Sequence, residues 1–260
     1  MGRMATDVNA QAIALPMARS SPTAGHNSRI AVPPSWYLDE LAHAGPEHLD
    51  ASYVAGYDRK ARVDAAAEVA QLGLSASSTL LDLGTGTGSV ALAAAPICRR
   101  VVAVDISAAM LAELRRKAEE LRLANLEVVR AGLLSYAHQG SPADVVYARH
   151  CLHQLPDFWK AIALRRMATI LRPGGLLRVR DLLFSCEIDE VSEAVERWLD
   201  RASLDSGVGW TRAELETHLR EEHSTFTWLF EAMLVHAGFE IVEASYDDSR
   251  IYAAYSCVRQ

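Results

Sequence analysis

The stretch from Leu80 to Val90 constrains the fold of this chain more than any other. An apolar run typical of a buried strand stops at Gly84, and a helical pattern of small residues begins at Val90. Between them stand two further glycines, Gly86 and Gly88. Glycine permits positive φ and close approach of a ligand, and the following helix points its free N–H groups at the same place. The pattern therefore predicts a strand–turn–helix unit that holds a polar or anionic part of a ligand.

Two carboxylates accompany this turn. Asp82 lies two positions before Gly84, and the second buried-type strand, Val101 to Asp105, ends in a carboxylate. From Gly84 to Asp105 is 105 − 84 = 21 positions, close to the roughly 20 expected of an acidic residue that holds ribose hydroxyls. The spacing is G-x-G-x-G rather than the G-x-G-x-x-G of dinucleotide binders. The simpler alternative is a tight turn with a solvated aspartate.

Here the chain resembles the class I S-adenosylmethionine (SAM) dependent methyltransferases. Asp82 to Gly88 is similar to the first motif of that family, and Val104-Asp105 to its second. Asp144 to Pro156 is similar to the region of strand four, and Leu171 to Leu177 to the turn before strand five. The four segments come in family order, and the resemblance covers about residues 51–260. It implies a Rossmann-like, doubly wound, mostly parallel α/β sheet of seven strands with an antiparallel last strand, and SAM as the cofactor.

The domain organisation follows from the same comparison. We expect a disordered tail over residues 1–30 and a single methyltransferase domain over residues 31–260. Residues 31–73 read as N-terminal helices that cover the site. Residues 184–238 form a helical insertion after strand five, since about 55 residues exceed what one crossover helix needs. An insertion of this kind can cover a cleft and choose the substrate.

Particular residues predict where several elements begin and end. Ser107 is a suitable N-cap for a helix over residues 108–123. Within the insertion, Thr211 to Glu214 reads as a capping box, and Ser224 or Thr225 as the cap of a further helix that ends at Gly238. Polar and aromatic residues are expected to gather around the joints of these helices: Trp210, His218, Glu222, His223, Thr225 and Trp228.

Composition and charge narrow the class of protein. A net charge of −7 argues against a broad nucleic-acid footprint, which would be basic. The four cysteines are scattered without a C-x-x-C pair, which favours a reducing compartment and gives no sign of a metal site. No run of 18 apolar residues suggests a membrane span. We therefore expect a cytoplasmic protein with a small-molecule partner, and the sequence leaves its oligomeric state open.

The resemblance also implies which residues hold the cofactor. Besides Asp82, Gly84, Gly86 and Asp105, it implies cofactor binding by Ile106, Met110 and Leu133. Met110 lies where the family places apolar contacts to adenine, although it could equally fill the core. Many members carry an acid at the position of Leu133, so that here either Ser135 or backbone groups take its place or adenine is held less specifically. Arg149 can reach the SAM carboxylate or an acidic substrate. An aromatic residue from the N-terminal helices can lie against SAM, with Tyr57 the first candidate and Tyr53 the second. Alternatively, either tyrosine only packs its helix against the domain.

Methyl transfer needs the acceptor and the methyl group held in line, and a hydroxyl acceptor also needs a base. The candidates are His153 after strand four, Asp181 at the end of strand five and His223 in the insertion. His153 also matches a histidine of the family pattern, so it can have a structural role alone. Arg178 and Arg180 share one face of a central strand, which favours pairing with acids.

The sequence thus predicts a SAM-dependent methyltransferase acting on a small molecule. A protein of this fold without catalysis, acting as a scaffold or sensor, remains an alternative. A nicotinamide oxidoreductase is disfavoured by the glycine spacing.

Overall fold

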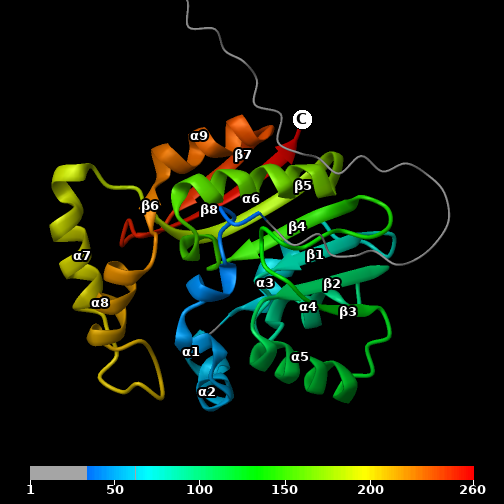
Figure 1. The fold of residues 1–260 in the computed structure, drawn as a ribbon, viewed down its shortest axis with the longest axis horizontal. Coiled ribbons are helices and arrows are strands. Elements are labelled where there is room, and N and C mark those ends of the chain that lie inside the picture. The colour runs from blue at the N-terminus through cyan, green and yellow to red at the C-terminus, as the bar shows by residue number, and fades with distance from the viewer. Residues whose placement is uncertain (1–33, 62) are drawn as a thin grey trace, which may run out of the picture. The chain divides into compact units, whose positions relative to one another are not determined.

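The computed structural model describes residues 34–61 and 63–260, and a mixed β-sheet lies at its centre (Figure 1). Seven strands follow the order β3-β2-β1-β4-β5-β8-β7. They are β1 Thr79–Leu83, β2 Arg100–Asp105, β3 Leu126–Arg130, β4 Ala143–Arg149, β5 Leu171–Phe184, β7 Phe239–Tyr246 and β8 Tyr252–Arg259. The first five pair in parallel, and β8 runs antiparallel to both β5 and β7. The predicted sheet with an antiparallel last strand is confirmed. An eighth strand, β6 (Thr225–Phe226), pairs with β5 and was not predicted.

Helices connect these strands, and residues Leu38–Gln260 form one compact unit. The predicted tail over residues 1–30 lies outside the described residues. The helices are η1 Glu40–His43, α1 Pro46–Leu49, α2 Ala51–Ala61, α3 Ala65–Ala70, α4 Ser89–Ala94, α5 Ala108–Glu120, η2 Leu152–Gln154, α6 Asp157–Ile170, η3 Ile188–Glu190, α7 Val191–Leu199, α8 Arg212–Glu221 and α9 Thr227–Ala237. Among the described residues, no helix combines the length and the apolar character that crossing a membrane requires.

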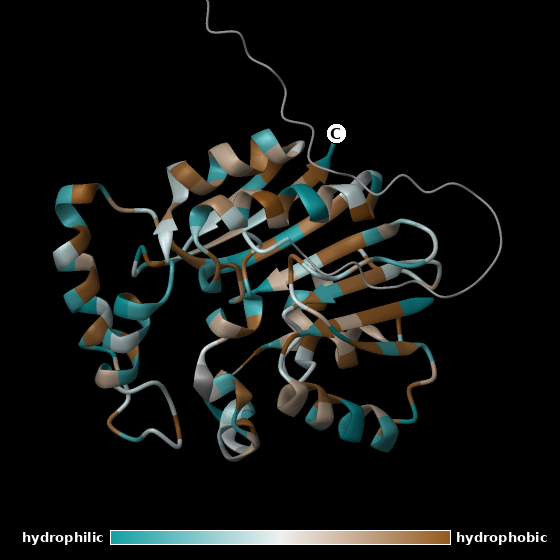
Figure 2. Ribbon diagram, viewed as in Figure 1, coloured by the Kyte–Doolittle hydropathy of each residue, from teal (hydrophilic) through white to brown (hydrophobic). Residues whose placement is uncertain are grey.

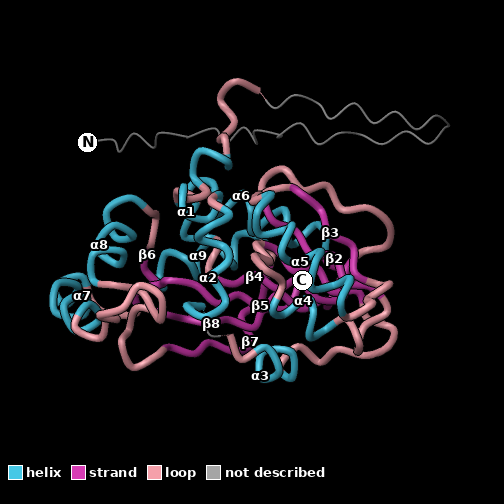
Figure 3. Tube along the Cα trace, turned by 90° about the horizontal axis from the view of Figure 1, so that it is seen from below, coloured by secondary structure: helices cyan, strands magenta, loops and turns pink. Residues whose placement is uncertain are grey.

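Burial of both faces of the sheet accounts for the continuous apolar runs in the sequence. All five residues of β1 are buried, and Figure 2 shows apolar residues concentrated along the strands. On one face, Leu80, Val101 and Val145 pack against Val90 of α4 and Leu111 of α5. Figure 3, seen from below, shows α3 and α6 on opposite sides of the sheet. The sheet is therefore covered on both faces, as a mostly parallel sheet must be.

Local capping signals explain several helix ends. The Ser107 side chain accepts a hydrogen bond from the Met110 N–H at 3.1 Å, and Thr211 with Glu214 forms the predicted capping box. Gly238 ends α9 in the left-handed region with φ 96°. The prediction that Ser224 or Thr225 caps α9 was wrong, because Thr225 pairs with β5 and the helix begins only at Thr227.

The two arginines of β5 are paired, as predicted. Arg178 donates to Ser256 Oγ at 2.9 Å and to Gln71 Oε1 at 2.7 Å. Arg180 lies 3.3 Å from Glu68 Oε1. Charges on a central strand are tolerated here because each guanidinium finds hydrogen-bond acceptors on neighbouring elements.

The insertion divides into two parts. Helices α7 and α8 lie beyond the ends of the strands, on the side away from β2 and β3 (Figures 1 and 3). Trp198, Leu199 and Leu215 form a small core there with Leu182 of β5 and Ile251. Helix α9 instead packs beside α6. Only the first part stands where it can close over the carboxyl ends of the strands.

Candidate functional site

The glycine-rich turn after β1 adopts a conformation that only glycine adopts without strain. Gly84, Gly86 and Gly88 have φ of 68°, 55° and 85°. A β-carbon on Gly84 would lie 2.5 Å from Cβ of Cys151, and one on Gly86 would lie 3.7 Å from the ring of Tyr57. The turn is therefore packed between the loop after β4 and helix α2, with no room for a side chain at residue 84.

Asp82 and Asp105 stand on either side of this turn. The Asp82 side chain is 3% exposed and accepts a hydrogen bond from Thr85 Oγ1 at 2.7 Å. Burial raises the pKa of Asp82 to about 7, although the hydrogen bond from the Thr85 hydroxyl lowers it. Asp105 accepts from the N–H groups of Gly86 and Ser107, both at 2.8 Å, and burial raises its pKa as well. Two desolvated carboxylates thus face one turn, and a ligand with hydroxyl or ammonium donors suits them.

Two cavities meet at the turn. The larger holds about 630 Å³ and reaches Asp82, Arg149, His153 and helix α8. The smaller holds about 110 Å³ and lies against Asp105. Residues common to both cavities come from the turn, the N-terminal helices and the loop after β4: His48, Tyr57, Gly84, Gly86, Arg149, His150 and Gln154. All nine residues predicted to hold the cofactor line one cavity or both, and Ile106, Met110 and Leu133 lie together at the smaller one.

Arg149 and His150, which line both cavities, each carry a polar atom without a partner. Arg149 Nε and His150 Nε2 are buried and have no hydrogen-bond partner among the described residues. Burial and the neighbouring Arg149 cation lower the pKa of His150 to about 3, so its imidazole is neutral. Buried donors and acceptors without partners are costly and rare in native proteins. A bound polar molecule would satisfy them, so the residues present fit a zwitterionic ligand such as SAM.

Tyr57 covers the turn from helix α2. Burial and the nearby Asp105 raise the pKa of its hydroxyl to about 12. The helix is anchored by Asp58, which accepts hydrogen bonds from Thr87 Oγ1 of the turn and from Lys117 Nζ of α5 at 2.5 Å. Tyr57 thus lines both cavities beside the turn, whereas Tyr53 lines only the larger cavity.

Glu40 is a residue that the sequence analysis did not single out. Its carboxylate accepts from the Leu134 N–H at 2.8 Å and lies where any β-carbon on Gly132 would collide with it. Burial raises its pKa despite that hydrogen bond. Ser135, expected to replace the missing acid, accepts instead from the N–H of Gly132 at 2.8 Å. Glu40 therefore brings a carboxylate to the smaller cavity from outside the family motifs.

His153 and Asp181 form a buried pair at the floor of the larger cavity. His153 Nδ1 lies 2.5 Å from Asp181 Oδ1. Asp181 also accepts from the N–H groups of Leu152 and Leu182, both at 2.8 Å. Although burial opposes ionisation of both groups, the imidazole holds the pKa of Asp181 well below its usual range. Asp181 is consequently an anion that fixes the orientation of the histidine ring.

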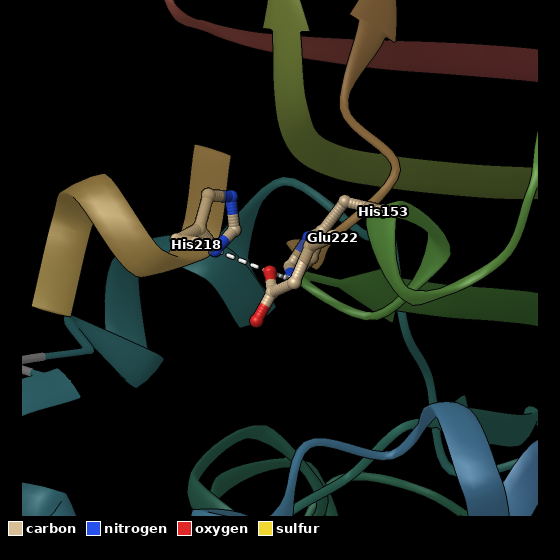
Figure 4. Close-up of side chains that lie close together, drawn as sticks. All are labelled: His153, His218 and Glu222. Atoms are coloured by element: carbon tan, nitrogen blue, oxygen red, sulfur yellow. Dashed lines mark ion pairs between the residues drawn. The ribbon is translucent and has the colours of Figure 1, made fainter. Parts of the chain in front are cut away.

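The other face of His153 meets helix α8. Its Nε2 lies 3.1 Å from Glu222 Oε2, and His218 Nδ1 forms an ion pair with the same oxygen. Figure 4 shows the Glu222 carboxylate between the two imidazoles. Burial acts against protonation, but Asp181 and Glu222 outweigh it and raise the pKa of His153 to about 9. The insertion thus brings two further titratable groups to the predicted base.

The other candidate residues of the insertion do not all lie at the larger cavity. The backbone N–H of His223 donates to the His153 carbonyl at 2.7 Å, but its ring stands against His43 with 5.7 Å between centroids. His223 does not line either cavity. Trp210 lines the larger cavity, while Trp228 is 54% exposed on α9. The aromatic part of the larger cavity comprises Tyr53, Tyr57, Tyr147, Trp198, Trp210 and Tyr252.

Sequence comparison matches the core of this fold. Residues 80–175 match a family model described as a methyltransferase domain. A 27-O-demethylrifamycin SV methyltransferase from Amycolatopsis mediterranei is 30% identical over 165 residues, covering 58% of this chain and 55% of that protein. The chain thus spans about half the length of this relative.

Structural comparison gives the same fold at lower identity. A SAM-dependent methyltransferase from Aquifex aeolicus is similar with a TM-score of 0.59 and 17% identity, covering 81% of this chain and 99% of that one. The [4+2]-cyclase SpnF is similar with a TM-score of 0.57 and 18% identity, covering 74% and 78%. These two likenesses establish the fold and leave the reaction to be argued from the site.

Proposed function

We propose, from the premise that the chain belongs to the class I SAM-dependent methyltransferase family, that it transfers a methyl group from SAM to a small-molecule acceptor. The observation that carries the proposal is the junction of two cavities at one glycine-rich turn, with Asp82 facing the larger and Asp105 the smaller. A ligand with an amino acid at one end and a nucleoside at the other matches this division.

Different residues of the site would bind different parts of the cofactor. Asp82 suits the ammonium group and Arg149 the carboxylate of the methionine part, since opposite charges in a desolvated site attract strongly. Asp105 suits the ribose hydroxyls. Ile106, Met110 and Leu133 suit the faces of adenine, and the Glu40 carboxylate can accept a hydrogen bond from its amino group. Tyr57 closes the site over Gly86.

When bound, SAM supplies a methyl group on a sulfonium, which is already reactive toward nucleophiles. The protein mainly has to hold the acceptor in line, and positioning of this kind supplies roughly 7–11 kcal/mol of a barrier. The larger cavity, with its aromatic walls, is where we place the acceptor. Its mixed lining suits a partly apolar molecule with at least one polar group.

His153 is the residue that we place against the accepting group. Asp181 fixes Nδ1, so Nε2 is the atom directed toward Glu222 and the cavity. Because the pKa of His153 is about 9 in the protein alone, its neutral form prevails only above that pH. In that form Nε2 can take the proton of an acceptor hydroxyl, and Asp181 stabilises the cation that results. Asp181 is thus a positioning residue, and we leave His223 out of the catalytic set.

The test is calorimetric titration with SAM, with S-adenosylhomocysteine and with NAD in parallel. We expect micromolar binding of the first two and none of NAD. Asp105→Ala should abolish SAM binding because the ribose loses its acceptor. Binding of NAD alone would refute the proposal in favour of an oxidoreductase. SAM binding without methyl transfer to any acceptor in a screen with labelled SAM would favour the scaffold or sensor.

A further inference from the structure

Three side chains from two separate segments converge at one wall of the larger cavity. His153 comes from η2, His218 from α8, and Glu222 from the residue that ends α8 (Figure 4). One potential ligand atom of each lies within 4.8 Å of the other two. The side chains of His153, His218 and Glu222 are only 7%, 15% and 13% exposed. Two imidazoles and a carboxylate are thus gathered in a desolvated place that opens on a cavity.

The outer contacts of both histidines direct their other ring nitrogens toward the Glu222 carboxylate, where a cation could bind all three groups. The Asp181 carboxylate accepts a hydrogen bond from Nδ1 of His153. The lone pair of the neutral ring is therefore on Nε2, which faces Glu222. Ser224 Oγ lies 3.4 Å from Nε2 of His218, so Nδ1 is the nitrogen that faces inward. A carboxylate on the far nitrogen of a histidine is the arrangement that orients metal-binding histidines.

We propose that His153, His218 and Glu222 bind a divalent cation of the zinc class, with an open coordination position toward the larger cavity. Two histidines and one glutamate are a ligand set of catalytic zinc sites, which keep a fourth position for water or substrate. Nitrogen ligands favour zinc over magnesium or calcium, which prefer oxygen. The charges also agree, because the anions Asp181 and Glu222 balance a doubly charged cation while both imidazoles stay neutral.

The role of the cation rests on the proposed function, whereas its binding does not. In the loaded site, the acceptor oxygen would take the open position, since the same cavity is where we place the acceptor. A hydroxyl bound to a cation is more acidic, so its O–H bond breaks with the proton passing to solvent in the cavity. His153 is then a ligand of the cation rather than the base. The transfer of methyl to this oxygen needs no other reactant than SAM.

The experiment titrates the chelator-treated full chain with Co²⁺, a spectroscopic probe for zinc sites, and with Zn²⁺ by calorimetry. We expect one equivalent of each to bind, with visible absorption from Co²⁺. His218→Ala and Glu222→Gln should weaken binding by at least a hundredfold. Asp181→Asn should weaken it about 10–100-fold, the usual loss on removing the partner of a metal-bound histidine. His43→Ala, a histidine of the same cavity outside the trio, should bind as the wild type does.

Two results would overturn the proposal. The first is absence of Co²⁺ and Zn²⁺ binding in a folded wild-type protein, which would make the three groups a hydrogen-bonded network only. The second is unchanged binding in both His218→Ala and Glu222→Gln, which would place the cation elsewhere. Circular dichroism of each variant checks its fold. SAM titration of the same samples separates this failure from failure of the proposed function, because SAM binding does not involve the trio.

Discussion

Replacing Asp82 by asparagine should stabilise the protein at neutral pH while removing affinity for SAM. Burial raises the pKa of Asp82 from 3.8 to about 7 in the protein without cofactor. The folded state therefore holds a proton that the unfolded state has lost, so stability falls as the pH rises between these two values. A rise of the pKa from 3.8 to about 7 amounts to roughly 4 kcal/mol of stability lost above pH 7. Asparagine carries no charge and escapes this loss.

The assay is urea unfolding of the wild type and Asp82→Asn at pH 5 and at pH 8. We expect the variant to exceed the wild type by roughly 1.6 kcal/mol at pH 5, where the carboxyl of the unfolded chain is already ionised, and by an amount approaching 4 kcal/mol at pH 8. Asp248→Asn, an exposed carboxylate, serves as the matched control and should change little. SAM should bind the variant more weakly by about 2–5 kcal/mol, the usual loss when one partner of a buried charge pair is removed. Equal stability of variant and wild type at both pH values would refute the reasoning.

Four further substitutions test other parts of the site. Gly84→Ala should destabilise the protein by at least 1–2 kcal/mol in urea, about the cost of a left-handed residue. Adding Cys151→Gly to this variant should relieve only the collision with Cβ of Cys151. An unchanged urea midpoint for Gly84→Ala would contradict the geometry. Glu40→Gln should weaken SAM binding by calorimetry, since the amide presents donors as well as an acceptor, and unchanged affinity would remove it from the adenine site. His153→Ala should lower the rate of methyl transfer about 10²–10⁴-fold and leave the dissociation constant of SAM unchanged; loss of SAM binding instead would make the role structural.

Much of the sheet could be predicted because its central strands β1, β2 and β4 are largely buried. The continuous apolar run of β1 ends at glycines with positive φ, and such boundaries depend only on neighbouring residues. Strand β6 could not be predicted in this way, since two residues carry no periodicity. Thr225 resembles a helix cap because threonine is common both at helix caps and in strands. Its pairing with Leu183 of β5 places Thr225 in a strand instead.

The site was predictable where its residues follow strand ends. Asp82, Asp105 and Arg149 stand at such ends, and parallel strands bring their carboxyl ends to one edge of a sheet. The contact between His153 and Glu222 could not be inferred, because it depends on how α8 folds back across the insertion. Glu222 and His218 were noted only as members of a polar group near the helix joints, and no local pattern distinguished them from His223.

Glu40 shows how a missing motif residue can be replaced from another part of the chain. Leu133 stands where the family carries an acid, which left adenine without an acceptor in the sequence reading. The carboxylate of Glu40 now lies beside Gly132, held by the N–H of Leu134. In this arrangement the acceptor belongs to η1 rather than to the sheet, and η1 precedes the helix that carries Tyr57. In the proposed binding mode, the acceptor for the adenine amino group thus comes from the same N-terminal helices that bring Tyr57 to the glycine-rich turn.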